Sequence, residues 1–148
     1  APAHATYYVS NDRGGQIGQY LQNYAMVRDS GQQVVVDGNC LSACTLLLGI
    51  IPRERIAVTP RARFGFHAAW KPDDDGRPIT SKEGTQALWS VYPPTIRRWI
   101  KAHGNLTRHM IFLSAAAYEH LYLRKHAKTR KVAHRTKHHR PVLARAAQ

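Results

Sequence analysis

The first fifty residues carry the pattern that most constrains the fold: a strand, a helix, a second strand and a second helix. Residues 6–10 are β-branched or aromatic and end in a glycine turn, which indicates a strand. Apolar residues recur at helical spacing from Ile17 to Val27, and Ser30-Gly31 ends that helix. The all-apolar run at 34–36 is typical of a buried parallel strand, and residues 42–48 indicate a buried helix. The pattern predicts an α/β domain with a parallel sheet.

Beyond residue 50 the sequence predicts further short elements separated by turns. Pro93-Pro94 separates two of the helices, and Gly104 is a candidate C-cap for the second. In chain order, we expect strands at 55–58 and 63–67, a polar loop at 70–80, helices at 81–91 and 96–104, and a last helix at 114–123.

The net charge of +13 is concentrated at the C-terminal end. Nine of the 22 Lys and Arg residues, and none of the nine acids, follow Leu123, which leaves residues 1–123 with 13 basic residues against nine acidic ones, or +4. We therefore expect a folded domain at 6–123 and a basic, disordered tail at 124–148. A solvated tail is the simpler interpretation, and charge alone would also let it bind nucleic acid or an anionic membrane.

The first five residues form a small-residue leader. Ala3-His4-Ala5 fits the pattern of a signal-peptidase site, so residues 1–5 are interpreted either as a signal-peptide remnant or as an alanine-rich leader without function. The first interpretation predicts a periplasmic or secreted bacterial protein, with Cys40 and Cys44 in an oxidising compartment. No apolar run reaches the roughly 18 residues that span a bilayer.

Ser42 has the local setting of a nucleophile. It follows the strand at 34–36 and a turn at Asp37-Gly38-Asn39, and it begins a helix. Such a turn exposes the hydroxyl, while the helix N-terminus supplies unpaired N–H groups for an oxyanion. A serine that only caps the helix is the alternative interpretation.

Three segments resemble the Clp protease proteolytic subunit, within the Clp/crotonase superfamily. They are Ser10-Asn11-Asp12-Arg13-Gly14-Gly15, Ser42-Ala43-Cys44 and Gly65-Phe66-His67, and the interval of 25 residues from Ser42 to His67 matches that family. Residues 40–45 and 60–67 are closer still to small exported bacterial members. The resemblance covers nearly half the chain strongly, and it implies repeated β-β-α units, truncated at the N-terminus.

The same resemblance implies a serine hydrolase that acts on peptides or on small esters and amides. Ser42 would be the nucleophile and His67 its base, and the N–H groups of Gly15 and Ala43 would form the oxyanion hole. A glycine at 15 would allow a close approach to substrate and a positive φ. No cofactor or metal is implied. The resemblance allows a homo-oligomer, but the ring and the ATPase partner of that family are not carried over to this shorter chain.

The acid of the family's catalytic triad is missing. The family has an Asp just before a segment like Phe112-Leu113-Ser114-Ala115, and this chain has Met110 there. A thioether cannot stabilise an imidazolium. Three interpretations stay open: a Ser–His dyad oriented by Asn105 or a backbone carbonyl, an acid supplied by the loop around Asp73, or an inactive domain that binds peptides.

Cys40 and Cys44 flank Ser42. A metal site would need two further ligands nearby, and a disulfide between positions i and i+4 of a regular helix is strained. The favoured prediction is that both are small buried apolar residues beneath the serine.

Overall fold

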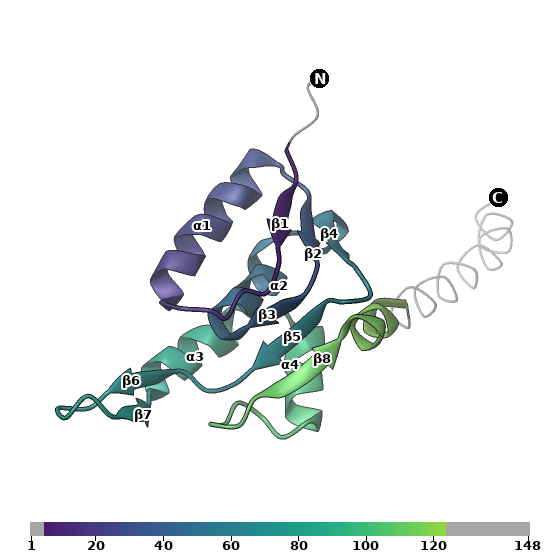
Figure 1. Ribbon diagram of the computed structural model, residues 1–148. Coiled ribbons are helices and arrows are strands. Elements are labelled where there is room, and N and C mark those ends of the chain that lie inside the picture. The colour runs from purple at the N-terminus through teal and green to yellow at the C-terminus, as the bar shows by residue number, and fades with distance from the viewer. Residues whose placement is uncertain (1–4, 124–148) are drawn as a thin grey trace, which may run out of the picture. The chain divides into compact units, whose positions relative to one another are not determined.

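Three parallel strands form the first sheet of the computed structural model, which describes residues 5–123 (Figure 1). They are β1 (Tyr7–Val9), β2 (Val34–Val36) and β4 (Ile56–Val58), in the order β1-β2-β4. Val34 pairs with Tyr7 on one side and Ile56 on the other, so β2 is the central strand. Its flanking valines Val34 and Val36 are buried, as the all-apolar run predicts.

The second sheet contains β3 (Asn39–Leu41), β5 (Arg63–Phe66) and β8 (Ile111–Ser114). β3 and β5 are parallel, whereas β5 and β8 are antiparallel. An isolated parallel bridge joins Asp12 to Cys40 at the free side of β3. The chain therefore passes from the first sheet to the second three times: from β1 to Asp12, from β2 to β3, and from β4 to β5.

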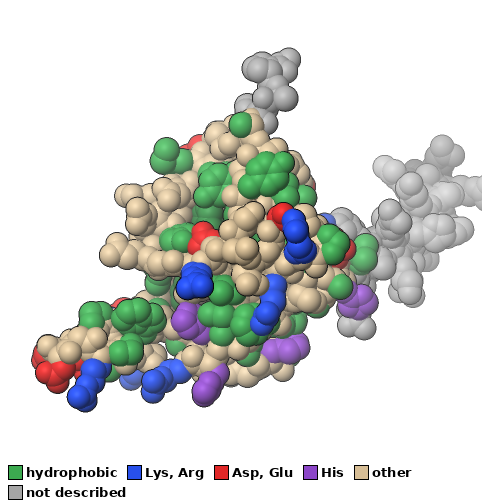
Figure 2. Space-filling model, viewed as in Figure 1, with side chains coloured by type: hydrophobic (Ala, Val, Ile, Leu, Met, Phe, Trp, Pro, Cys, Tyr) green, Lys and Arg blue, Asp and Glu red, His purple; other side chains and the backbone are tan. Residues whose placement is uncertain are grey.

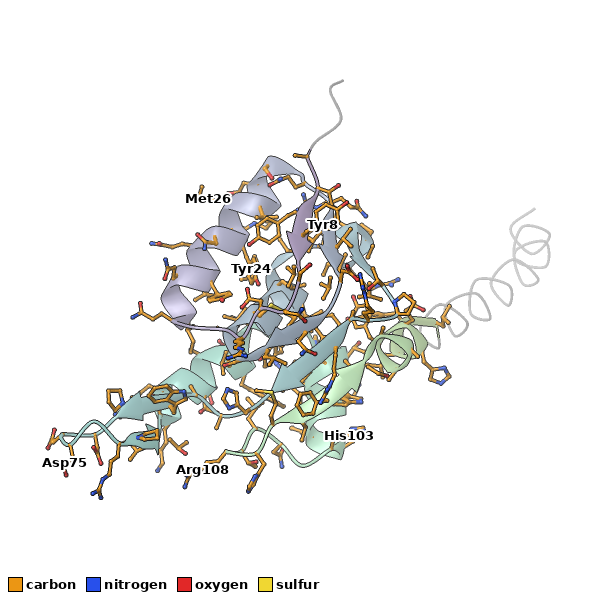
Figure 3. All side chains as sticks on the ribbon, viewed as in Figure 1. Tyr8, Tyr24, Met26, Asp75, His103 and Arg108 are labelled. Atoms are coloured by element: carbon orange, nitrogen blue, oxygen red, sulfur yellow. A yellow bond between two sulfur atoms is a disulfide. The ribbon has the colours of Figure 1, made fainter. Side chains whose placement is uncertain are left out.

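Helices follow the first two of these passages. α1 (Ile17–Ser30) follows Asp12, and the short 3-10 helix η1 (Ser42–Leu46) with α2 (Leu47–Ile50) follows β3. Gly31 ends α1 with a left-handed φ of 75°, as its sequence predicts. In Figure 3, Tyr24 points from α1 towards the strands, while Met26 points away and is 71% exposed.

Three more helices follow before β8: η2 (Arg53–Arg55), α3 (Lys82–Val91) and α4 (Pro94–Ala102). Ser81 caps α3, since its Oγ accepts the N–H of Gly84 at 3.0 Å, and Pro94 opens α4. These two helices match the predicted ones closely. The fully buried large side chains come from both sheets and from all the longer helices: Tyr24, Val34, Val36, Leu46, Leu47, Phe64, Phe66, Leu88, Tyr92, Ile96, Ile100 and Leu113.

Two local predictions were wrong, and the last helix was predicted to within one residue. The polar loop expected at 70–80 is a hairpin of β6 (Trp70–Pro72) and β7 (Pro78–Thr80), turned by Gly76 at φ 80°. The turn expected at 37–39 is shorter, because Asn39 already pairs with Arg63 in β3. Residues 111–114 form a strand, and the last helix begins one residue later, at Ala115.

The chain divides into two compact units, residues 1–115 and 116–148. In the second unit, the structure describes helical residues 116–123, where the rings of Tyr118 and Tyr122 meet edge to face at 5.1 Å. The predicted basic tail, and all but one residue of the predicted leader, lie outside the described residues. Within residues 5–123, no helix has the length and apolar character needed to cross a membrane.

Candidate active site

Ser42 and His67 line one cleft of about 670 Å³ in the first unit. His67 Nε2 lies 2.9 Å from Ser42 Oγ, which is hydrogen-bonding distance. The loop at 13–15, the start of α1, Trp70 and Leu88 form much of the remaining wall. The structure thus brings together, within one cleft, the two side chains that the sequence paired.

Ser42 has a backbone conformation that a non-glycine residue rarely adopts. Its φ is 57°, in the left-handed region, directly between the last residue of β3 and the rest of η1. For an L-residue this conformation costs about 1–2 kcal/mol, so it persists only where the surroundings enforce it. The sequence predicts a turn at 37–39 but neither strand β3 after it nor the positive φ at Ser42, because serine is an unusual choice for that conformation.

A disulfide joins Cys40 to Cys44 across Ser42, with the two Cα atoms 5.2 Å apart. The prediction of two free apolar cysteines was therefore wrong. A disulfide between positions i and i+4 is strained only where both lie on one regular helix, whereas Cys40 belongs to β3 and Cys44 to η1. Both are fully buried, and Tyr24 Oη donates to the carbonyl oxygen of Cys44 at 2.9 Å.

His67 directly follows β5, the central strand of the second sheet, so its position is fixed by a strand paired on both sides. Burial lowers the pKa of its imidazole below the ordinary value of 6.5. The ring is therefore neutral at pH 7, and its Nε2 can accept the proton of Ser42 Oγ. This is the protonation state that a general base requires.

No carboxylate of the described residues hydrogen-bonds to His67. Among these residues, the His67 side chain has one hydrogen-bond partner, the hydroxyl of Ser42. Met110 stands where an acid would be needed: the β5–β8 register pairs Phe66 with Ile111, so Met110 comes opposite His67 one step beyond the ladder. Met110 also lines the cleft.

The two residues predicted as substitutes for this acid have other partners. Asp73 Oδ1 accepts the N–H groups of Asp75 and Arg77, so its carboxylate organises the hairpin turn. In Figure 3, Asp75 lies at the end of this hairpin. Asn105 is exposed, has φ 67°, and follows α4 with its N–H bonded to the carbonyl oxygen of Ile100. Within residues 5–123 neither side chain orients His67.

The loop at 13–15 packs directly against the serine. A Cβ placed on Gly14 would lie 2.7 Å from the carbonyl oxygen of Leu41 and 2.8 Å from Ser42 Cβ. Gly14 also has a φ of 88°, whereas Gly15 has no positive φ. The glycine requirement that was assigned to residue 15 thus belongs to residue 14. Gly15 still lines the cleft, and Ala43, the second residue of η1, has no carbonyl one turn earlier to bind its N–H.

Asp12 holds this loop in place, a role that the sequence did not reveal. Its Oδ1 accepts the N–H of Gly14 at 2.8 Å and the hydroxyl of Tyr20 at 2.6 Å. Its backbone bridges to β3, accepting the N–H of Leu41 and donating to the carbonyl oxygen of Asn39. Burial first, and then the hydrogen bond to Asp12, raises the pKa of Tyr20, so the phenol remains a donor. An Asp two residues before a glycine is also common in ordinary turns, which hid this signal.

The described residues contain no group of three or more His, Cys, Asp or Glu side chains that could hold a metal ion. Among known proteins, no family model matches this sequence, and no curated protein matches it.

Proposed function

We propose that this chain is a serine hydrolase that acts on acyl groups of esters or peptides through a Ser42–His67 dyad. The observation that carries the proposal is the 2.9 Å contact between His67 Nε2 and Ser42 Oγ, at a serine held at φ 57° in an open cleft. A serine hydroxyl next to a neutral imidazole is the arrangement that nucleophilic catalysis needs. A capping serine would not require a left-handed backbone.

In this mechanism, Ser42 Oγ bonds to the substrate carbonyl carbon while its proton passes to His67 Nε2. The N–H groups of Gly15 and Ala43 are proposed to stabilise the oxyanion, since Gly15 lines the same cleft as the serine, Ala43 follows the serine directly, and the first N–H groups of η1 lack helical partners. His67 returns the proton to the leaving group. Water then attacks the acyl-enzyme with His67 again as base, releasing the acid and restoring the serine.

We further propose a Clp/crotonase-like fold. It is supported by the three successive passages from the first sheet to the second, because repeated β-β units followed by helices are what the resemblance implies. Export to the periplasm or cell exterior is supported by the buried Cys40–Cys44 disulfide, since such bonds persist mainly in oxidising compartments.

A fluorophosphonate probe, which phosphonylates activated serines, tests the function. We expect labelling of the wild-type protein at Ser42, located by peptide mass spectrometry, and its loss in Ser42→Ala and His67→Ala. Ser90→Ala and His103→Ala are matched controls, because both side chains lie on or beside helices outside the cleft and bond only to local carbonyl oxygens. A folded wild-type protein that resists the probe at neutral pH contradicts the proposal.

The second candidate is a catalytically inactive domain that binds peptides in the same cleft. Met110 opposite His67 favours it, because no acid of the described residues contacts His67 to stabilise the imidazolium that forms during turnover. This candidate predicts that peptide binding persists in Ser42→Ala and that no covalent adduct forms. Binding of nucleic acid or membrane by the basic tail concerns residues outside the described part of the chain.

A further inference from the structure

Arg13 is the one Lys or Arg among the described residues that line the Ser42–His67 cleft. It immediately precedes Gly14, the residue packed against Ser42 Cβ, so its backbone is fixed next to the nucleophile. Within the described residues it forms no ion pair, whereas Arg28 and Arg61 each pair with an aspartate. Arg13 is thus an exposed cation at the cleft, and no acidic side chain of residues 5–123 forms an ion pair with it.

No Asp or Glu is among the described residues that line this cleft. Asp12 is next to Arg13 in the chain, but its Oδ1 is bonded to Gly14 and Tyr20. Glu83 precedes Gly84 on α3 and does not line the cleft. The acidic side chains of the β6–β7 hairpin, whose first strand lines the cleft, gather at the far end of that hairpin (Figure 2).

A second arginine adds positive charge beside the cleft. Arg108 lines an adjoining hollow of about 220 Å³, which shares His67, Ala69 and Trp70 with the main cleft and is likewise lined by no acid of the described residues. Figure 3 shows Arg108 on the segment before β8. An apolar wall with a cation on one side favours a ligand that has an apolar chain and a single negative charge.

From this arrangement we infer that Arg13 is a specificity-determining residue that selects acyl groups carrying a carboxylate. The inference rests on the proposed hydrolase function and names its substrate class. The guanidinium can bind a carboxylate through two parallel N–H bonds, which fixes the acyl chain while its ester carbonyl meets Ser42. Charge attraction within the cleft also raises the association rate of anionic substrates at low salt.

Two esters with the same six-carbon acyl chain test the inference: 4-nitrophenyl hydrogen adipate, which is anionic, and 4-nitrophenyl hexanoate, which is neutral. In each, Ser42 Oγ would bond to the carbonyl carbon, His67 would take its proton, and 4-nitrophenolate would leave. Water would then release adipate or hexanoate. Rates measured with Ser42→Ala give the background to subtract.

We expect the wild-type kcat/KM to be higher for the adipate ester, with the ratio falling as salt screens the charge. Arg13→Gln should lower the adipate value by about fivefold to tenfold, the range of a charge-assisted hydrogen bond in a partly exposed site. It should leave the hexanoate value within about twofold, because a neutral chain does not use the charge. Arg13→Lys should restore part of the preference, and Arg98→Gln, on the exposed face of α4, should change neither value.

Equal kcat/KM values for the two esters overturn the specificity while leaving the hydrolase function intact. So does an Arg13→Gln variant that keeps the wild-type ratio. If a folded wild-type protein turns over neither ester and resists the fluorophosphonate probe, the hydrolase function and this inference both fall.

Discussion

Replacing Gly14 by alanine tests whether the loop at 13–15 determines the position of Ser42. The new Cβ would lie 2.7 Å from the Leu41 carbonyl oxygen and 2.8 Å from Ser42 Cβ. The first of these neighbours is backbone and the second is tied closely to it, so neither can rotate away. The loop or the serine must therefore shift by several tenths of an ångström.

The free-energy cost has two parts. Alanine at φ 88° costs about 1–2 kcal/mol, and overpacking against a fixed backbone typically adds about 1–3 kcal/mol. We therefore expect Gly14→Ala to lower the free energy of unfolding by about 2–5 kcal/mol. A displaced nucleophile should also lower the rate of fluorophosphonate labelling by about tenfold or more, because reactivity depends steeply on alignment.

Two other glycines separate these parts. Gly18, in α1, has no positive φ, and a Cβ added there would meet no atom within 4 Å, so Gly18→Ala should stabilise the protein by up to about 1 kcal/mol. Gly76 has φ 80° with open space around it, so Gly76→Ala should show only the cost of the backbone, about 1–2 kcal/mol. Both should label at the wild-type rate. Urea unfolding and labelling kinetics measure the two effects, and a folded Gly14→Ala that labels like wild type refutes the reasoning.

Four further predictions concern the histidine and the disulfide. Because burial lowers the pKa of His67, the labelling rate should fall at low pH as the ring gains a proton, with a midpoint below 6.5; a midpoint above 6.5 contradicts this. The same shift stabilises the fold above the unfolded pKa relative to lower pH, and that contribution is lost as the pH falls towards the folded pKa. Met110→Asp should place a carboxylate opposite His67, raise the pH midpoint of labelling and increase turnover, whereas Met110→Leu should do neither. Replacing Cys40 and Cys44 together by alanine removes a cross-link with a sequence separation of 4 and should lower the unfolding free energy by about 2 kcal/mol in urea, and an unchanged midpoint contradicts that estimate.

Much of the helical structure could be predicted from the sequence, because its signals are local. The apolar spacing of α1, the cap at Ser81 and the proline at the start of α4 each act within a few residues. The hairpin at 70–80 and strand β8 could not be predicted in the same way. Phe112-Leu113-Ser114 becomes a strand by pairing with β5, about fifty residues earlier in the chain, and no local pattern records that partner.

In the candidate site, too, features with local signals could be predicted and features that depend on distant residues could not. Ser42 stands out through its local setting, whereas its pairing with His67 comes from the resemblance to the Clp family, whose serine-to-histidine interval this sequence matches. The role of Asp12 could not, since it depends on Tyr20 and Gly14 meeting one carboxylate oxygen. The disulfide was not favoured because the strain of an i, i+4 pair was judged for a regular helix, whereas Cys40 lies in β3, before the helical residues begin. For the disulfide, the deciding fact is how the chain turns at Ser42.

That turn is held from several sides at once. The disulfide links the strand before Ser42 to the helix after it, Thr45 Oγ1 donates to the Ser42 carbonyl oxygen at 2.6 Å, and Gly14 closes the remaining side. These contacts offset the cost of the left-handed backbone, and the hydroxyl of Ser42 lies 2.9 Å from His67 Nε2. Since no described acid orients the histidine, the reactivity of the proposed dyad depends mainly on this fixed serine. Substitutions around the turn should therefore impair labelling more than substitutions on the far side of the imidazole, such as Met110→Leu.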